Sequence, residues 1–166
     1  SCLENNVPNY IYVGTACSFP KHLQNRENSR IAEHLTYPAQ PESSYGWSKL
    51  MGEYEADLAR LSGRINVGVL RLHNAFGPFA TFDPDRSQVI PSLIRKAIIY
   101  PDEPLVVWGS GEQYRDFIYV DDIIDALFLM ASRGMNQGLI QVGSEKQTSV
   151  REVAELIIDI SDSTMD

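Results

Sequence analysis

Short runs of β-branched and aromatic residues alternate along the chain with longer segments in which apolar residues recur every three or four positions. The runs at 10–15, 65–72 and 138–143 have the composition of buried strands. Two more runs, at 105–109 and 116–120, predict strands on either side of a glycine-containing turn. Because strands alternate with helices, the pattern predicts an α/β fold with a parallel sheet.

Four segments have the periodicity of helices. The clearest begins near Ser43 and ends before Gly63, which supplies a stop. A second helix is expected around 88–99, and a third, begun by two aspartates, over about 121–133. The helices therefore follow strands at regular intervals, as a parallel sheet requires.

The last helix and two long connections complete the predicted layout. Ser149 with Glu152 three residues later forms a capping box ahead of an apolar helical stripe. The connections at 18–41 and 73–87 contain several prolines and lack periodicity. Loops as long as the one at 18–41 are commonly functional.

Composition excludes several function classes. The chain has 166 residues, enough for one domain with its own core, and a net charge of −8 with dispersed basic residues. That charge argues against nucleic acid or an anionic membrane as a partner. Cys2, Cys17 and three scattered histidines make neither a disulfide framework nor a metal site, and no apolar run is long enough to span a membrane. These features predict a cytoplasmic protein without a metal.

Tyr45 and Lys49 are four residues apart in the clearest helix, so both can face one ligand. A nearby ammonium favours the phenolate, which allows the phenol to exchange a proton with a substrate hydroxyl near neutral pH. By itself this spacing also fits a solvated helix face. Thr15 ends the first strand, and Asn74 and Arg115 follow in later segments, so polar groups from four segments converge where ligands bind in parallel α/β sheets.

Five motifs together carry a family resemblance: VGTAC, SSYGWSK, RLHNAFGPF, SQVIPSLIRKA and GSGEQYRDFIYVDD. In their order and spacing they resemble the extended short-chain dehydrogenase/reductases, specifically the NAD-dependent nucleotide-sugar epimerases and dehydratases. The resemblance implies a partial Rossmann-like fold, the carboxyl-terminal half of a doubly wound parallel sheet, with part of a small substrate-binding subdomain. It divides one truncated domain into a Rossmann-type part, 1–78 and 116–145, and a substrate-binding part, 79–115 and 146–166.

The resemblance assigns roles to individual residues. Thr15, Tyr45 and Lys49 match the catalytic triad, in which Tyr45 removes a proton from a sugar hydroxyl while hydride passes to NAD. Lys49 would also hold the nicotinamide ribose together with Tyr45, and His73, at a strand end, would lie beside the cofactor.

The same resemblance predicts how a nucleotide diphosphate sugar is held. Asn74 and Arg115 would bind its diphosphate, Arg115 through charge-assisted hydrogen bonds. Val89, in the VIP motif, would pass near the nucleotide base.

The GDP-mannose 3,5-epimerase subgroup has the most similar motifs, and its catalytic base matches Cys17. The lysine that serves that subgroup as the partner acid is replaced by Gln88. A glutamine cannot deliver a proton, so 4-epimerisation or another reaction on a nucleotide sugar is at least as well supported. A buried, unreactive role for Cys17 is the alternative to a catalytic one.

The glycine-rich turn that receives the dinucleotide pyrophosphate in this family has no match. Gly109 and Gly111 are followed by Tyr114 where a third glycine is needed, and they come too late in the chain. The chain therefore resembles the middle-to-late part of an epimerase, and we expect no turnover from it alone. The alternative is a non-catalytic remnant that binds a nucleotide sugar weakly or serves as an assembly module.

Self-association is the last expectation from the sequence. The helix after Ser43 carries more apolar residues than one sheet face can cover, and the first strand would present an unpaired edge. The apolar residues are Trp47, Leu50, Met51, Tyr54, Leu58 and Leu61. We expect a homodimer or another self-associated form.

Overall fold

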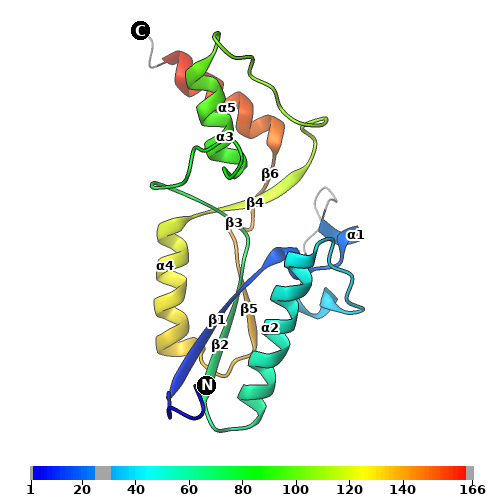
Figure 1. The fold of residues 1–166 in the computed structure, drawn as a ribbon, viewed down its shortest axis with the longest axis vertical. Helices are drawn as coiled ribbons and strands as arrows, with labels where there is room; N and C mark the ends of the chain where they lie inside the picture. Colours follow the sequence, from blue (N-terminus) through cyan, green and yellow to red (C-terminus); the bar gives the residue numbers. More distant parts are fainter. Residues whose placement is uncertain (1, 25–30, 164–166) are drawn as a thin grey trace.

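The computed structural model describes residues 2–24 and 31–163, and it has the predicted α/β architecture (Figure 1). The strands are β1 (Asn9–Thr15), β2 (Asn66–Leu72), β3 (Asn74–Phe76), β4 (Tyr114–Tyr119), β5 (Leu139–Val142) and β6 (Gln147–Ser149). The α-helices are α1 (Lys21–Gln24), α2 (Ser44–Leu61), α3 (Val89–Ile99), α4 (Val120–Leu129) and α5 (Val150–Ser163). The predicted ranges 18–41 and 146–166 both extend into residues outside those described.

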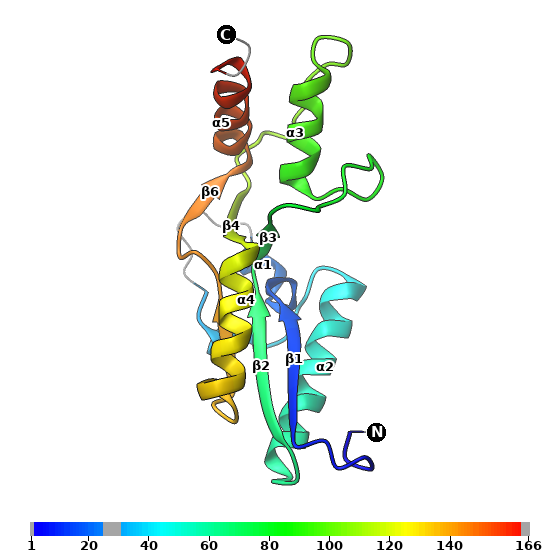
Figure 2. The same cartoon turned by 90° about the vertical axis from the view of Figure 1, so that its left-hand side faces the viewer.

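The main sheet is parallel and has the order β1-β2-β5. It lies between α2 on one face and α4 on the other (Figures 1 and 2). Its core forms where β2 packs against α2, around Ala56, Ile65, Val67 and Val69. The predicted strands at 10–15, 65–72 and 138–143 are confirmed, because buried apolar runs of this length suit a sheet covered on both faces.

A second, smaller sheet has the order β3-β4-β6, with β3 parallel and β6 antiparallel to β4. Next to it, α3 packs against α5 through a separate core of Leu93, Val153 and Ala154. The chain passes directly from β2 through His73 into β3, so the carboxyl edge of the main sheet adjoins the small sheet.

The expected strand at 105–109 is wrong. In this segment Val107 packs against the core between α3 and α5, and the carbonyl of Val106 accepts a hydrogen bond from Lys96 Nζ at 2.6 Å. Val107 is thus covered by helices instead of pairing in a sheet, and Val106 and Trp108 are exposed. Conversely, β3 and β6 were not predicted, because strands of three residues are too short to show a period and form by pairing with β4.

The capping box predicted at the start of α5 is confirmed. The Ser149 hydroxyl accepts a hydrogen bond from the Glu152 backbone N–H at 3.1 Å, and Glu152 Oε2 accepts from the Ser149 backbone N–H at 2.7 Å. Hydrogen bonds from the backbone and the hydroxyl of Ser149 lower the pKa of Glu152 below its ordinary value of 4.5. Both groups therefore favour the ionised carboxylate at the helix terminus.

We predict that Ser149→Ala lowers the free energy of unfolding by about 1 kcal/mol, the usual cost of losing a cap. Because the folded state depresses the pKa of Glu152, the carboxylate stabilises the fold above pH 4.5 and loses that effect as pH falls through the lower folded value. Urea unfolding of both proteins at neutral and acidic pH measures this. A difference between them that is the same at both pH values would contradict the assigned role of Glu152.

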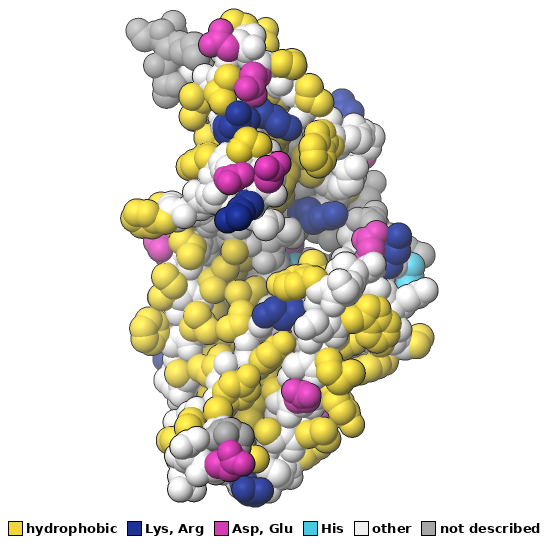
Figure 3. Space-filling view, in the orientation of Figure 1, with side chains coloured by type: hydrophobic (Ala, Val, Ile, Leu, Met, Phe, Trp, Pro, Cys, Tyr) yellow, Lys and Arg dark blue, Asp and Glu magenta, His cyan; other side chains and the backbone are white. Residues whose placement is uncertain are grey.

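The apolar stripe of α2 divides between two faces. Leu50 is 6% exposed and packs inward, whereas its neighbours in the stripe point outward with exposed fractions between 47% and 66%. These outward residues, which we call the α2 outer stripe, are Trp47, Met51, Tyr54, Leu58 and Leu61. In the part of the chain that the structure describes, β1 pairs with β2 alone, and apolar side chains gather over β1 between α4 and α2 (Figure 3).

Candidate functional site

The candidate site begins where β1 ends and α2 starts. Thr15, the last residue of β1, caps a single 3₁₀ turn (Ala16–Ser18), and its hydroxyl accepts a hydrogen bond from the Cys17 backbone N–H at 3.3 Å. Ser43 caps α2 in the same way, accepting from the backbone N–H of Gly46 at 3.2 Å. Both caps give a partner to a backbone N–H in the first turn of a helix, which would otherwise have none.

A glycine allows the first turn of α2 to contact the 3₁₀ turn directly. A Cβ atom at Gly46 would lie 2.3 Å from the carbonyl oxygen of Cys17, closer than any side chain can approach. The start of α2 is therefore fixed against the segment that follows Thr15. Tyr45, the residue before this glycine, is 54% exposed and can be reached by a ligand.

Lys49 lies one helical turn after Tyr45 and is tied to the end of β1. Its ammonium donates a hydrogen bond to the backbone carbonyl of Val13 at 2.9 Å and lies 5.5 Å from the centre of the Tyr12 ring. The Tyr12 hydroxyl in turn donates to the Lys49 carbonyl at 3.2 Å. The lysine is thus held at the carboxyl edge of the main sheet, two residues before Thr15.

Tyr12 is a component of the site that sequence reasoning missed. Burial, followed by the charge of Glu53 and the neighbouring phenols including Tyr45, raises the pKa of Tyr12. Its phenol therefore stays protonated and keeps the hydrogen that it donates to the Lys49 carbonyl. Gly52 makes room for it, since a Cβ atom there would meet the Tyr12 hydroxyl at 2.2 Å, and a glycine three residues after Lys49 is the signal that could have shown this contact.

A buried ionic cluster lies behind the site and was also missed. Arg71, in β2, is fully buried and forms a salt bridge with Glu53 of α2. It also donates to the hydroxyl of Thr36 at 2.8 Å and lies 4.3 Å from the centre of the Phe19 ring. One guanidinium therefore joins β2, α2 and both ends of the connection at 18–41. We call these four residues the Arg71 cluster.

His73 lies where β2 leaves the main sheet. Its backbone N–H donates to the Val142 carbonyl at 3.1 Å, and its ring nitrogen Nε2 is 3.2 Å from Oε1 of Gln141. These two contacts fix His73 to β5 through its backbone and its side chain. The imidazole is half-buried. The predicted place of His73 beside a cofactor remains a proposal.

Asn74 and Arg115 lie on neighbouring strands of the small sheet. Asn74 pairs with Phe117 of β4, two residues after Arg115, and the Arg115 guanidinium donates to the Tyr114 carbonyl at 2.8 Å. Both side chains are half-buried. Val89, predicted near a nucleotide base, begins α3 and packs partly buried against the core around Leu93. The binding roles of these three residues stay predictions.

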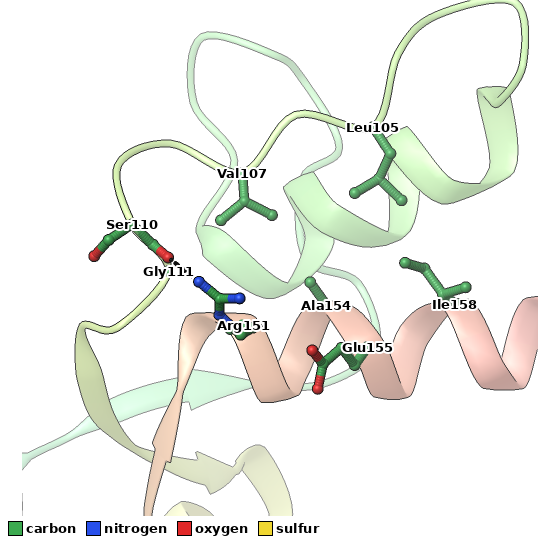
Figure 4. Close-up of a pocket in the computed structure, with 8 residues that line it drawn as sticks. All are labelled: Leu105, Val107, Ser110, Gly111, Arg151, Ala154, Glu155 and Ile158. Atoms are coloured by element: carbon green, nitrogen blue, oxygen red, sulfur yellow. Dashed lines mark hydrogen bonds between the residues drawn. The ribbon is translucent and has the colours of Figure 1, made fainter.

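A shallow pocket opens between α5 and the segment at 105–111 (Figure 4). It has a volume of about 330 Å³ and is lined mainly by apolar side chains, including Leu105, Val107 and Ile158. Its arginine, Arg151, already donates to the Ser110 carbonyl and pairs with Glu112 at 2.9 Å. None of the predicted site residues lines this pocket, so it is not the candidate site.

The described part of the chain contains neither a cluster of metal ligands nor a membrane-spanning helix. Among residues 2–24 and 31–163, no three histidine, cysteine or acidic side chains gather in a way that could hold a metal ion. Within the same ranges, no helix combines the length and apolar character needed to cross a bilayer.

Known proteins resemble this chain in sequence. GDP-mannose 3,5-epimerase 1 of Oryza sativa is 29% identical over 158 residues, which are 95% of this chain and 41% of that protein. GDP-L-fucose synthase 1 of Arabidopsis thaliana is 28% identical over 166 residues, covering 96% of this chain and 50% of that protein. The chain therefore spans half or less of the length of these relatives.

Solved structures share the fold. UDP-glucose 4-epimerase of Thermotoga maritima, determined with UDP-glucose, superposes with a TM-score of 0.83 at 24% identity, covering 97% of this chain and 50% of that one. UDP-N-acetylglucosamine 4-epimerase of Methanobrevibacter ruminantium gives 0.80 at 30% identity, covering 99% and 49%. Residues 1–143 match the family described as NAD dependent epimerase/dehydratase. The chain belongs to this NAD-dependent epimerase/dehydratase family.

Proposed function

We propose that the chain carries the catalytic residues and part of the substrate site of an NAD-dependent nucleotide-sugar epimerase or dehydratase. The observation that carries the proposal is the anchoring of Lys49. Its ammonium is held 2.9 Å from the Val13 carbonyl at the end of β1, on the helix face that also carries Tyr45. This is the edge of a parallel sheet at which ligands bind.

Tyr45 is the proposed acid/base. Its exposed phenol, one helical turn before Lys49, is the group proposed to take a proton from a sugar hydroxyl. Thr15 offers its hydroxyl to the reacting oxygen. NAD, when bound, supplies the acceptor for hydride from the sugar carbon, and Tyr45, Lys49 and His73 are the residues proposed to hold its nicotinamide end.

The proposed substrate is a nucleotide diphosphate sugar. Asn74 and Arg115, on adjacent strands of the small sheet, would hold the diphosphate, and Val89 would lie near the base. Cys17 is exposed, so the buried position considered for it is wrong, and its role as the catalytic base is part of the proposal. Because Gln88 supplies no acid, we propose 4-epimerisation as readily as 3,5-epimerisation.

Product analysis tests the proposal in a protein that holds both halves of the site. We define the completed enzyme as this chain joined behind a glycine-rich amino-terminal half, taken from the gene sequence before Ser1 where that encodes one, or from a related epimerase. Incubated with NAD and a panel of GDP- and UDP-sugars, it should convert at least one of them to an epimer or a dehydrated sugar, read by proton NMR. Absence of conversion with both kinds of amino-terminal half would overturn the proposal.

The α2 outer stripe supports a second proposal, that the chain self-associates through this helix. Its five apolar side chains are between 47% and 66% exposed along one helix, and apolar surfaces of this kind mark contact sites. A twofold dimer would pair the stripe with its own copy.

We predict that light scattering at micromolar concentration gives a mass well above the 18.6 kDa of one chain. Replacing Met51 and Leu58 by lysine should return it to the monomer, because each substitution places a charge in the contact. Ile98→Lys, at a still more exposed apolar position on α3, is the control and should leave the mass unchanged. A mass of 18.6 kDa for the unaltered chain would refute self-association.

A further inference from the structure

The imidazole of His73 is held against β5 in one orientation. Its backbone N–H donates to the Val142 carbonyl, and a Cβ atom at Gly143 would lie only 3.1 Å from its Cδ2 atom. The ring therefore packs its Cδ2–Nε2 edge against β5, where Nε2 meets Oε1 of Gln141 at 3.2 Å. The opposite edge of the ring carries Nδ1.

The chemistry around Gln141 decides which end of its amide faces His73. On its far side, the amide nitrogen Nε2 lies 2.7 Å from the carbonyl oxygen of Ile31, which can only accept. The carboxylate of Glu33 lies on the same side and accepts hydrogen bonds from the side chain and the backbone N–H of Gln141. Rotating the amide by half a turn would bring its oxygen against these acceptors.

We propose that Gln141 is a positioning residue that holds His73 in its Nε2–H tautomer. This makes Nδ1 a fixed hydrogen-bond acceptor at the carboxyl edge of the main sheet, where the proposed ligands bind. Since the amide oxygen of Gln141 can only accept, the ring nitrogen opposite it must carry the proton. In a neutral imidazole the other nitrogen, Nδ1, is then the acceptor. It suits a ligand that presents a hydroxyl or an amide N–H.

This inference adds a residue and a proton position to the proposed function. The use of Nδ1 by a bound ligand rests on that proposed function, whereas the tautomer does not. The contacts that orient Gln141 come from Ile31 and Glu33, so the connection before α2 reaches the ring of His73 through one amide.

Nitrogen NMR of the full chain labelled with ¹⁵N-histidine tests the tautomer. At a pH where the imidazoles are neutral, His73 should show a pyrrole-type Nε2 and a pyridine-type Nδ1 with no second form. His22 and His34 are exposed and serve as references for an unrestrained mixture of tautomers. His73→Gln assigns the signals.

Gln141→Met removes the amide with little change of volume and should give His73 a mixture like that of the reference histidines. Gln137→Met, at an exposed position before β5, should leave the His73 tautomer unchanged. A mixed or Nδ1–H form of His73 in the unaltered chain overturns the inference without any variant. So does a Gln141→Met spectrum identical to that of the unaltered chain.

Ligand titration of the completed enzyme separates this inference from the proposed function. NAD or a nucleotide sugar should shift Nδ1 of His73 and leave the nitrogens of His22 in place. If His73 holds the single Nε2–H form but neither ligand moves Nδ1, the ligand role of His73 is contradicted while the positioning role of Gln141 stands.

Discussion

Replacing Tyr45 by phenylalanine in the completed enzyme is expected to lower kcat by about 10² to 10⁴, the range contributed by a general acid/base. The substitution removes only the phenolic oxygen, and that oxygen is the proposed proton acceptor. The side chain is half exposed and is not part of either core, so folding should be unaffected. Initial rates under saturating NAD and nucleotide sugar measure the effect.

Tyr54→Phe is the matched control for this prediction. Tyr54 lies on the same helix and is 53% exposed, yet it is nine residues further from the carboxyl edge of the sheet. Removing its hydroxyl should leave kcat within about twofold of that of the unaltered completed enzyme. Equal rates for Tyr45→Phe and Tyr54→Phe would show that Tyr45 is not the acid/base.

Arg71→Met is expected to lower the free energy of unfolding by about 3–5 kcal/mol, because it leaves the carboxylate of Glu53 buried without its partner. The same change removes the hydrogen bond that Arg71 donates to the Thr36 hydroxyl, and it removes the cation over the ring of Phe19. Urea unfolding of the chain measures the loss. As control, Arg60→Met breaks the more exposed pair with Asp57 and should cost at most about 1 kcal/mol.

The double variant Arg71→Met with Glu53→Leu tests the cause of that loss. Removing both charges replaces a buried ion pair by apolar groups, a change that is commonly neutral or stabilising. The double variant should therefore be more stable than Arg71→Met alone. If it is less stable, the Arg71 cluster stabilises the fold through packing or hydrogen bonds, and the buried unpaired charge is not the main cost.

Local sequence patterns predicted most of the main sheet and the helices. The strands at 10–15 and 65–72 are continuous apolar runs, and the helix from Ser44 to Leu61 has both a cap and a glycine stop. The segment at 105–109 misled because LVVWG is a short apolar run like those of the true strands, yet Leu105 and Val107 lie beside helices α3 and α5. Such a run predicts that apolar side chains are buried, and it does not say against which element.

Only the residues of the site that belong to sequence motifs could be predicted. Tyr45 and Lys49 could be paired from their spacing, whereas the partner of Lys49 is a backbone carbonyl, which no sequence pattern displays. The members of the Arg71 cluster are 18, 35 and 52 positions from Arg71, so Arg71 and Glu53 look like unrelated surface charges until the fold brings them together. Gln141 is invisible for the same reason, since its contacts come from a loop 110 residues earlier.

Stopped-flow absorbance of the nicotinamide ring in the completed enzyme tests the central claim most directly, that this chain uses Tyr45 and Lys49 to drive hydride transfer from a nucleotide sugar to NAD. Mixing the NAD-loaded enzyme with a sugar that it converts should produce reduced nicotinamide transiently, and its absorbance should decay as the hydride returns to the sugar. Tyr45→Phe and Lys49→Met should each suppress this signal. Product formation without any reduced nicotinamide, or an undiminished signal in both variants, would contradict the account.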